Sequence, residues 1–363
     1  MSSFQSKKPE EFQFKDIRYE KKDWIATVTI NRPGYYNAYS TLALQEMTLA
    51  FQDASWDDGI AVVILTGEGT QAFCAGGDVK DYEATYTKRP REYWKWMGVF
   101  AQCHDQLRSI GKPVIARLNG MVVGGGNEFN MACDLAVAAD HVVIRQVGTR
   151  VGSVACGGAT QWLPIMVGDR RAREILFLCE EIDAKKALDW GLVNQVVSSV
   201  TKNGTLIQNP SQEEIKKGLK GMDGYGISLS ELDKAVEILA QKLIQKFPEC
   251  LRYTKTQVNL WKDWAWNMTI GHAKDWLSLH FAYPEPHEGM QAFVEKRNPD
   301  YLGIREKARS GKSSEYFWGP PAQTCPSCRA KNIPEEFKFC GNCGAVLTAD
   351  KNTNKKAVEL HTP

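Results

Sequence analysis

The sequence has almost no excess charge of either sign and no long apolar run. Its 45 Lys and Arg against 43 Asp and Glu leave a formal net charge of +2, so no overall field attracts the chain to nucleic acid or an acidic membrane. No apolar stretch reaches the ~18 residues of a membrane helix, and none follows the charged N-terminus as in a signal peptide. We therefore expect a soluble cytoplasmic protein with neither a nucleic-acid nor a membrane partner.

The glycine-rich segments also lack the spacing typical of nucleotide-binding loops. Neither the dinucleotide pattern Gly-x-Gly-x-x-Gly nor a loop ending in Gly-Lys-Ser/Thr is found in them. The sequence therefore predicts no redox dinucleotide cofactor. Hydrophobic residues make up 43% of the 363 positions, which is enough for a sizeable core and excludes a disordered or fibrous protein.

Short apolar runs alternate with helical patterns in the first half of the chain. Four runs predict strands: Trp24–Ile30, Val62–Leu65, Val114–Ala116 and Leu135–Ala139. Helices are expected after Ser40 and over Tyr93–Leu107. This alternation predicts an α/β fold with a mostly parallel sheet. Beyond about residue 157 we expect almost only helices, including 229–247, interrupted by a turn-rich insertion at 202–210.

Four of the ten cysteines form a cluster near the C-terminus. They occur as two C-x-x-C pairs, Cys325/Cys328 and Cys340/Cys343, which is the spacing of a tetrahedral Cys₄ zinc site. Four cysteines fill the coordination of zinc, and the segment suggests no further group that would make the site catalytic. The zinc is therefore expected to be structural. The segment is expected to serve assembly or the docking of a protein partner. The alternative is four unrelated thiols or a disulfide pair.

Two glycine-rich turns, Phe73–Lys80 and Asn119–Glu128, each follow a predicted strand and precede a helix. Small residues let backbone N–H groups approach a ligand closely, and N–H groups from two turns can stabilise one oxyanion. The alternative is that these glycines only allow tight packing.

Together these turns and the segments around them resemble the crotonase (enoyl-CoA hydratase/isomerase) superfamily. The resemblance covers roughly residues 14–305 and also runs through the segments Ile30–Pro33, Asn37–Ala38, Met131–Asp134, Ala184–Val193 and Glu288–Arg297. It implies a ClpP-like spiral β-α core at 14–200 and an insertion with a helical trimerisation region at 201–305. A linker (306–324), a zinc ribbon (325–345) and a polar tail (346–363) lie outside it.

The resemblance also implies an acyl-CoA substrate and specific roles for residues. The N–H groups of Ala75 and Gly125 are expected to hold the thioester oxygen. The residues expected near the CoA nucleotide are Gly76, Asp78, Lys80 and, reaching a neighbouring subunit, Lys296. Lys80 and Lys296 are alternatively solvated surface charges. Family members are commonly trimers or pairs of trimers, so a homotrimer or homohexamer is expected.

Glu128 matches the first of the two glutamates that enoyl-CoA hydratases use to add water, but Gly148 stands at the second position. That glycine, followed by Val151-Gly152-Ser153, resembles the branch with ring-opening hydrolases of alicyclic acyl-CoAs. Those enzymes carry an aspartate shortly after this motif, whereas this chain has Cys156, a candidate nucleophile or acid, or simply a packed thiol.

Three functions therefore stay open. They are a hydrolase that adds water to an alicyclic enoyl-CoA and opens its ring, an enoyl-CoA hydratase or isomerase on another acyl-CoA, and a non-catalytic scaffold that recruits partners through the cysteines. The missing second glutamate argues against the ordinary hydratase, and Glu128 with the two turns argues against the scaffold. Tyr82 and Tyr86 are further candidate acids or parts of the pocket wall.

Overall fold

The computed structural model describes residues 4–319 and 321–347. The chain divides between Pro299 and Asp300 into two compact units, which are described separately below. Within the described ranges, no helix has both the length and the apolar character needed to span a membrane. The expected polar tail lies outside these ranges from residue 348 onward.

Sheets of the first unit confirm the expected α/β class. The main sheet has the order β1-β2-β3-β5-β7-β10, with parallel pairing except between β1 and β2. Its strands are β1 (Ile17–Lys22), β2 (Ile25–Ile30), β3 (Val62–Gly67), β5 (Val114–Leu118), β7 (Leu135–Ala139) and β10 (Gln195–Val197). All six residues of β3 are buried, as expected of an apolar strand covered on both faces.

A second sheet has the order β4-β6-β8-β9, with bounds Ala72–Cys74, Met121–Val123, Val143–Arg145 and Ile182–Asp183. Its first three strands are parallel neighbours. Because parallel strands end at the same edge of a sheet, the segments that follow β4, β6 and β8 are brought together. These segments are the two glycine-rich turns and the stretch that begins at Gln146.

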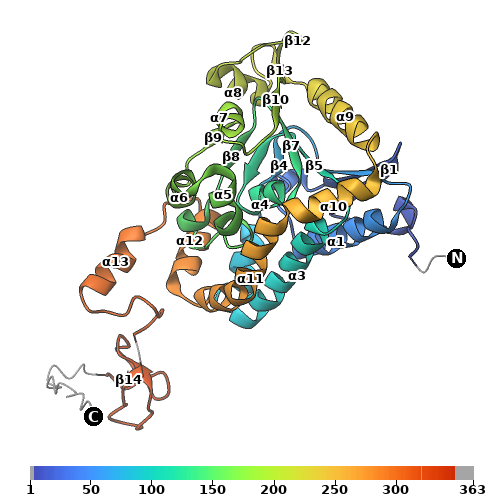
Figure 1. The fold of residues 1–363 in the computed structure, drawn as a ribbon. Helices are drawn as coiled ribbons and strands as arrows, with labels where there is room; N and C mark the ends of the chain where they lie inside the picture. The colour runs from blue at the N-terminus through green and yellow to red at the C-terminus, as the bar shows by residue number, and fades with distance from the viewer. Residues whose placement is uncertain (1–3, 320, 348–363) are drawn as a thin grey trace. The chain divides into compact units, whose positions relative to one another are not determined.

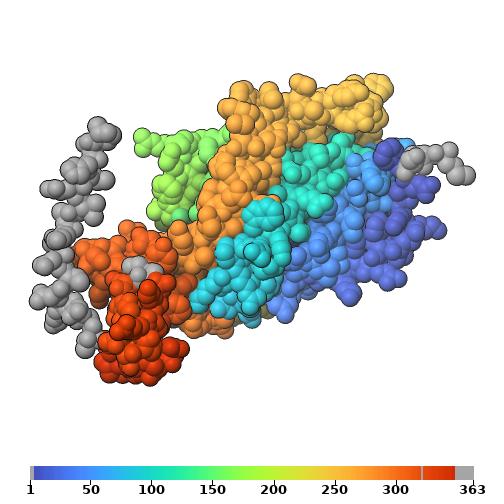
Figure 2. All heavy atoms as spheres, turned by 90° about the horizontal axis from the view of Figure 1, so that it is seen from below, coloured from blue at the N-terminus to red at the C-terminus, as the bar shows by residue number. Residues whose placement is uncertain are grey.

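Helices surround these sheets. Those up to residue 189 are α1 (Thr41–Trp56), α2 (Val79–Asp81), α3 (Pro90–Arg108), α4 (Gly125–Ala132), α5 (Ala159–Val167), α6 (Asp169–Leu178) and α7 (Ala184–Asp189). The later ones in this unit are α8 (Gln212–Lys220), α9 (Ser230–Ile244), α10 (Pro248–Val258), α11 (Leu260–His280) and α12 (Pro284–Val294). Helices α1, α3 and α11 lie side by side, visible as blue, cyan and orange bands in Figure 2, and α9 packs on the main sheet (Figure 1).

The helices expected from their patterns are present. Ser40 caps α1 by accepting a hydrogen bond from the Ala43 N–H, as Ser does at a helix N-terminus.

The expectation of an almost wholly helical second half is wrong in part, because β9 to β13 lie there. The insertion forms a sheet of order β12-β11-β13 (Thr205–Leu206, Val200–Lys202, Tyr225–Ile227). Asn203 and Gly204 both have positive φ at the β11–β12 hairpin turn, the conformation Asn-Gly favours.

The second unit holds helix α13 (Tyr301–Arg309) and a two-stranded sheet of β14 (Pro321–Gln323) and β15 (Ile333–Pro334). The segment expected as a linker therefore contains the end of α13 and all of β14. A small core of buried Cys325, Ile333, Cys340 and Leu347 follows. With so few apolar residues to bury, this segment has little hydrophobic stabilisation of its own.

Candidate active site

A cavity of about 100 Å³ lies where the segments after β4, β6 and β8 meet. Five of the residues expected in the site line it, namely Ala75, Gly76, Gly125, Glu128 and Cys156. Its walls are mostly apolar and aromatic, and they include Tyr39, Tyr82, Tyr93, Trp96, Phe100, Leu277 and Met290. A mostly apolar cavity with a few polar groups is typical of a small-molecule binding site.

Gly125, the predicted oxyanion donor, is the first residue of helix α4. The carbonyl of Gly124, in the same peptide plane, accepts hydrogen bonds from the N–H groups of Asn127 (2.9 Å) and Glu128 (3.2 Å). The Gln146 side chain donates a third, weaker one at 3.3 Å. These bonds fix the peptide, and the N-terminal end of a helix favours negative charge. The Gly125 N–H is therefore held in place before any substrate binds.

Ala75 does not supply the other donor that the sequence predicted. Its N–H already donates to the carbonyl of Tyr36 at 3.1 Å. Gly76 has a φ of +92°, so the chain turns and the N–H of Gly77 points elsewhere. Within the described ranges no backbone carbonyl accepts a hydrogen bond from the Gly77 N–H, and Gly77 lines the cavity. The prediction for Ala75 is wrong, and Gly77 is the better candidate for the second oxyanion donor.

The sequence alone did not indicate Gly77, because the direction of its N–H depends on pairing with a residue that is distant in sequence. Gly77 forms an isolated parallel bridge with Tyr39. The Tyr39 N–H donates to the Gly76 carbonyl at 2.9 Å, and the Asp78 N–H donates to the Tyr39 carbonyl at 3.2 Å. In such a bridge the flanking residues make the bonds, so the Gly77 N–H faces the other way.

Glu128 on α4 is the carboxylate of the cavity, and its side chain is almost completely buried. Burial raises the pKa of Glu128 to about 7, although N–H groups of Ala159 and Gly157 partly oppose this by donating to the carboxylate. The Ala159 bond is 3.2 Å long. A carboxylate with a pKa near neutrality can both take and return a proton. Glu128 is therefore suited to general acid–base chemistry.

This pKa gives a prediction for the pH dependence. Because Glu128 must be ionised to take a proton from water, kcat/KM should rise with pH up to about 7 and level off above it, since the free-enzyme base titrates there. A pH–rate profile measures this. A profile that stays level down to about pH 5, where an ordinary Glu is still mostly ionised, would contradict the assignment.

Gly148, where hydratases have a second glutamate, has little space for a side chain. A Cβ there would lie 3.0 Å from the Ser153 carbonyl oxygen and 3.2 Å from the Ala155 nitrogen. A side chain there would require this backbone segment to shift by a few tenths of an ångström. The cavity therefore has one carboxylate rather than two among its described lining residues.

Cys156 is 2% exposed and lines the cavity. Burial, and then the charge of Glu128, raise the pKa of its thiol far above the ordinary value. The thiol therefore stays protonated at neutral pH, which disfavours a thiolate nucleophile and leaves Cys156 as a neutral hydrogen-bond donor or a packed side chain.

The remaining residues expected at the CoA end lie outside the cavity lining. Asp78 caps the short helix α2 and forms an ion pair of 3.2 Å with Arg32, so it fixes the first glycine-rich turn. Lys80 and Lys296 are exposed at the surface. Their contacts with a CoA nucleotide stay a prediction.

The C-terminal helices of the same chain close one side of the cavity, through Leu277 of α11 and Met290 of α12. Two glycines allow α12 to pack closely on the segment that follows Gly148. A Cβ on Gly289 would lie 2.4 Å from the Val151 carbonyl oxygen, and one on Gly152 would lie 2.2 Å from the Glu285 carbonyl oxygen. Sequence reasoning assigned this helical region to trimerisation and missed its place in the cavity wall.

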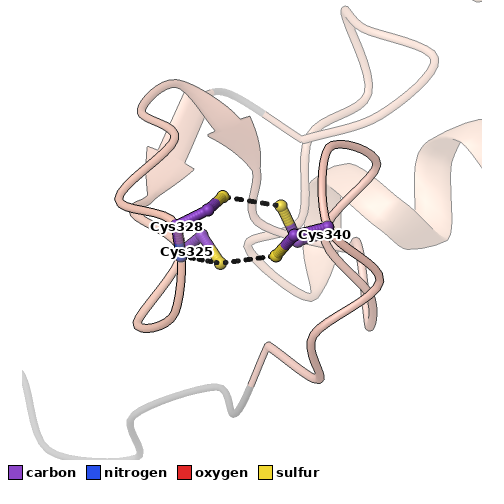
Figure 3. Close-up of side chains that lie close together, drawn as sticks. Cys325, Cys328 and Cys340 are labelled. Carbon is purple, nitrogen blue, oxygen red and sulfur yellow. Dashed lines mark hydrogen bonds between the residues drawn. The ribbon is translucent and has the colours of Figure 1, made fainter.

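The second unit holds the cysteine cluster as expected (Figure 3). All four sulfur atoms lie within 4.8 Å of one another. The Sγ atoms of Cys325 and Cys343 are 3.6 Å apart, and those of Cys328 and Cys340 are 3.7 Å apart. Disulfide sulfurs are about 2.05 Å apart, whereas four sulfurs placed tetrahedrally about 2.3 Å from zinc are about 3.8 Å apart. The cysteines therefore fit a metal better than disulfides.

Comparison with known proteins decides the family. A family model described as enoyl-CoA hydratase/isomerase matches residues 20–213, more than half of the chain. The chain belongs to the enoyl-CoA hydratase/isomerase (crotonase) superfamily. The expected fold class is thereby confirmed, and members of this superfamily are acyl-CoA enzymes.

Two curated relatives of this superfamily carry the same name, 6-oxocyclohex-1-ene-1-carbonyl-CoA hydrolase. The protein from Geobacter metallireducens is 35% identical over 332 residues, which is 81% of this chain and 87% of the relative. The protein from Thauera aromatica is 36% identical over 309 residues, 78% of this chain and 82% of the relative. The chain is therefore similar to hydrolases of an alicyclic acyl-CoA, as the sequence predicted.

Solved crotonase-superfamily structures share the fold. An enoyl-CoA hydratase from Mycobacterium avium subsp. paratuberculosis superposes with a TM-score of 0.64 at 21% identity, covering 79% of this chain and 98% of that one. An enoyl-CoA hydratase from Bacillus anthracis gives a TM-score of 0.57 at 25% identity, covering 80% and 100%.

Proposed function

We propose that this protein adds water to an alicyclic enoyl-CoA and then opens its ring by hydrolysis, with 6-oxocyclohex-1-ene-1-carbonyl-CoA as the substrate. The observation that carries the proposal is the single buried carboxylate of Glu128, which lines one cavity with Gly77 and Gly125, while Gly148 stands where a second acid would be. The names of the two relatives support this choice of substrate.

The first step adds one water across the conjugated C=C bond. Glu128 takes a proton from the water, whose oxygen bonds to the β-carbon. The electron pair of the C=C bond moves toward the thioester, whose oxygen becomes an enolate held by the N–H groups of Gly77 and Gly125. Protonated Glu128 then returns the proton to the α-carbon. One carboxylate can serve both transfers because its pKa lies near 7.

The second step adds another water and breaks the ring. Glu128 takes a proton from this water as its oxygen attacks the ring ketone carbon, giving a tetrahedral alkoxide. Collapse of the alkoxide breaks the bond between the ketone carbon and the α-carbon. The electron pair of that bond becomes the thioester enolate, which the same two N–H groups stabilise. Glu128 protonates the α-carbon, and the product is an open-chain dicarboxylic acid that keeps one CoA thioester.

A substrate panel tests this proposal against the ordinary hydratase. The protein is incubated with 6-oxocyclohex-1-ene-1-carbonyl-CoA, with cyclohex-1-ene-1-carbonyl-CoA and with linear crotonyl-CoA, and kcat/KM is measured for each. The ring ketone substrate should be preferred by at least ~10²-fold, because binding energy in a fitted cavity is specific. Equal or better turnover of crotonyl-CoA would favour the enoyl-CoA hydratase instead.

We also propose that Cys325, Cys328, Cys340 and Cys343 hold a structural zinc ion. The Cys328 N–H donates to the Cys325 sulfur at 3.4 Å, and the Asn342 side chain donates to the Cys328 sulfur at 3.5 Å. Such bonds stabilise thiolate ligands. Zinc would supply the folding energy that this small core lacks and takes no part in the reaction. Docking of a protein partner by this module stays a prediction.

Elemental analysis should therefore find about one zinc per chain. Changing Cys325 and Cys340 to Ser should remove it, because two ligands cannot retain a structural zinc. Cys250→Ser is the matched control, since Cys250 is an exposed thiol outside the cluster, and this variant should keep the metal. A metal-free protein in which residues 325–343 still show slow amide exchange would contradict the zinc site.

The assembly proposed from the family resemblance is a homotrimer or homohexamer. Helix α11 exposes several large apolar side chains in the single chain, among them Trp261 (62%), Trp264 (60%) and Met268 (64%). A cluster of this kind is typical of a surface that another subunit covers. Sedimentation equilibrium of the full chain measures the assembly directly.

A further inference from the structure

Two tyrosine hydroxyls stand beside the two glycines that supply the oxyanion donors. A Cβ on Gly125 would lie 1.9 Å from the Tyr39 hydroxyl oxygen, and a Cβ on Gly77 would lie 1.8 Å from the Tyr82 hydroxyl oxygen. Each phenol therefore occupies the space that a side chain at its glycine would need. Both tyrosines line the cavity.

Separate backbone features place the two side chains there. Tyr39 is held by its bridge to Gly77. Tyr82 opens a π-helical turn, Tyr82–Tyr86, in which the Thr87 N–H donates to the Tyr82 carbonyl at 3.0 Å. A π-helical turn is rare and occurs frequently at functional sites. Here it points the Tyr82 ring back toward the first glycine-rich turn, where the ring packs edge-on against Trp96 at 4.9 Å between centroids.

The two hydroxyls interact with each other, and within the described ranges neither has a further hydrogen-bond partner. Burial raises the pKa of both phenols well above the ordinary value, so both stay protonated. Two neutral hydroxyls carry two protons, and only one proton is needed for their mutual bond. One O–H donor is therefore left for a ligand at this end of the cavity.

From this placement we infer that Tyr39 and Tyr82 bind a second oxygen of the acyl group, so that the site selects CoA thioesters with an oxygen on the β-carbon. The inference rests on the proposed function. In a β-oxo thioester both carbonyl carbons are attached to the same α-carbon, so the second oxygen lies within a few ångströms of the first. With the thioester oxygen on Gly77 and Gly125, the β-oxygen falls beside the phenols.

This placement also fits the ring-opening step. Attack of water on the ring ketone turns its oxygen into an alkoxide, and a hydrogen bond to a charged oxygen is roughly twice as strong as one to a neutral oxygen. The phenol pair would then stabilise that alkoxide while the two N–H groups stabilise the enolate that leaves. Each of the two oxygens that become charged has its own donors.

Binding of two four-carbon thioesters tests the inference, because acetoacetyl-CoA and butyryl-CoA differ only in the β-oxygen. Dissociation constants are measured by calorimetry for the wild type, Tyr82→Phe and Tyr86→Phe. Tyr86→Phe is the matched control, since it lies on the same π-helical turn but its hydroxyl bonds to the Thr41 side chain at 2.8 Å.

Wild type and Tyr86→Phe should bind acetoacetyl-CoA more tightly than butyryl-CoA, and Tyr82→Phe should reduce this preference by ~10-fold, the effect of one lost hydrogen bond in a buried site. Tyr39→Phe should reduce it similarly. Equal weakening of both thioesters, or an unchanged preference, would overturn the inference. Wild type that binds neither thioester would overturn the proposed acyl-CoA function as well, whereas equal affinity for the two would overturn this inference alone.

Discussion

Replacing Glu128 with Gln should lower kcat by at least ~10²-fold while the affinity for acyl-CoA changes little. Gln keeps the shape of the side chain and can still accept the hydrogen bond from the Ala159 N–H, but it cannot take or return a proton. Both proposed steps pass through this one carboxylate, so hydration and ring opening should be lost together. Steady-state kinetics combined with calorimetry of a bound thioester measures the two effects separately.

Cys156→Ala is the comparison for this variant. Its thiol is the other group near Glu128 that could move a proton, but its raised pKa keeps it neutral, so this change should cost less than ~10-fold in kcat. If Glu128→Gln keeps near-normal turnover and Cys156→Ala abolishes it, the proton-transfer role belongs to the thiol and the mechanism is wrong.

Gly125→Pro should lower kcat by at least ~10²-fold below the level of Gly125→Ala. Both variants introduce a Cβ that approaches the Tyr39 hydroxyl, so both carry the same steric conflict. Only proline also removes the N–H. Gly125 is the first residue of α4, a position where helices tolerate proline, so the two variants differ in the N–H donor and in the proline ring carbon that replaces its hydrogen.

The readout is kcat for each variant, with circular dichroism to confirm that both keep the helical content of the wild type. Equal activity of the proline and alanine variants would show that the Gly125 N–H does not stabilise the transition state. The oxyanion site would then have to be built from other donors in the cavity.

Much of the fold could be predicted because its signals are local. The buried strand Val62–Gly67, the Ser40 cap and the Asn203-Gly204 turn each follow from residues next to one another in sequence. The four cysteines were found by spacing alone. The strands β9 to β13 were missed because each is only two or three residues long, too short for a period-2 pattern.

The sequence predicted which segments form the site, but not which backbone N–H groups in them face the ligand. Glu128 and Gly125 follow from one motif, and both line the cavity. Whether Ala75 or Gly77 faces the ligand depends on the bridge to Tyr39, and Tyr39 is 38 residues before Gly77. The wall formed by Leu277 and Met290 depends on how α11 and α12 fold back. Such long-range contacts leave no periodic signal in one sequence.

Counting the oxygen atoms that come from solvent tests the central claim most directly. The full-length protein is incubated with 6-oxocyclohex-1-ene-1-carbonyl-CoA in ¹⁸O-labelled water, and the products are analysed by mass spectrometry. The two proposed steps predict a ring-opened product with two solvent oxygens, one in a hydroxyl group and one in the new carboxylate. A product that stays cyclic with a single labelled oxygen, or an unchanged substrate, would contradict ring opening by this protein.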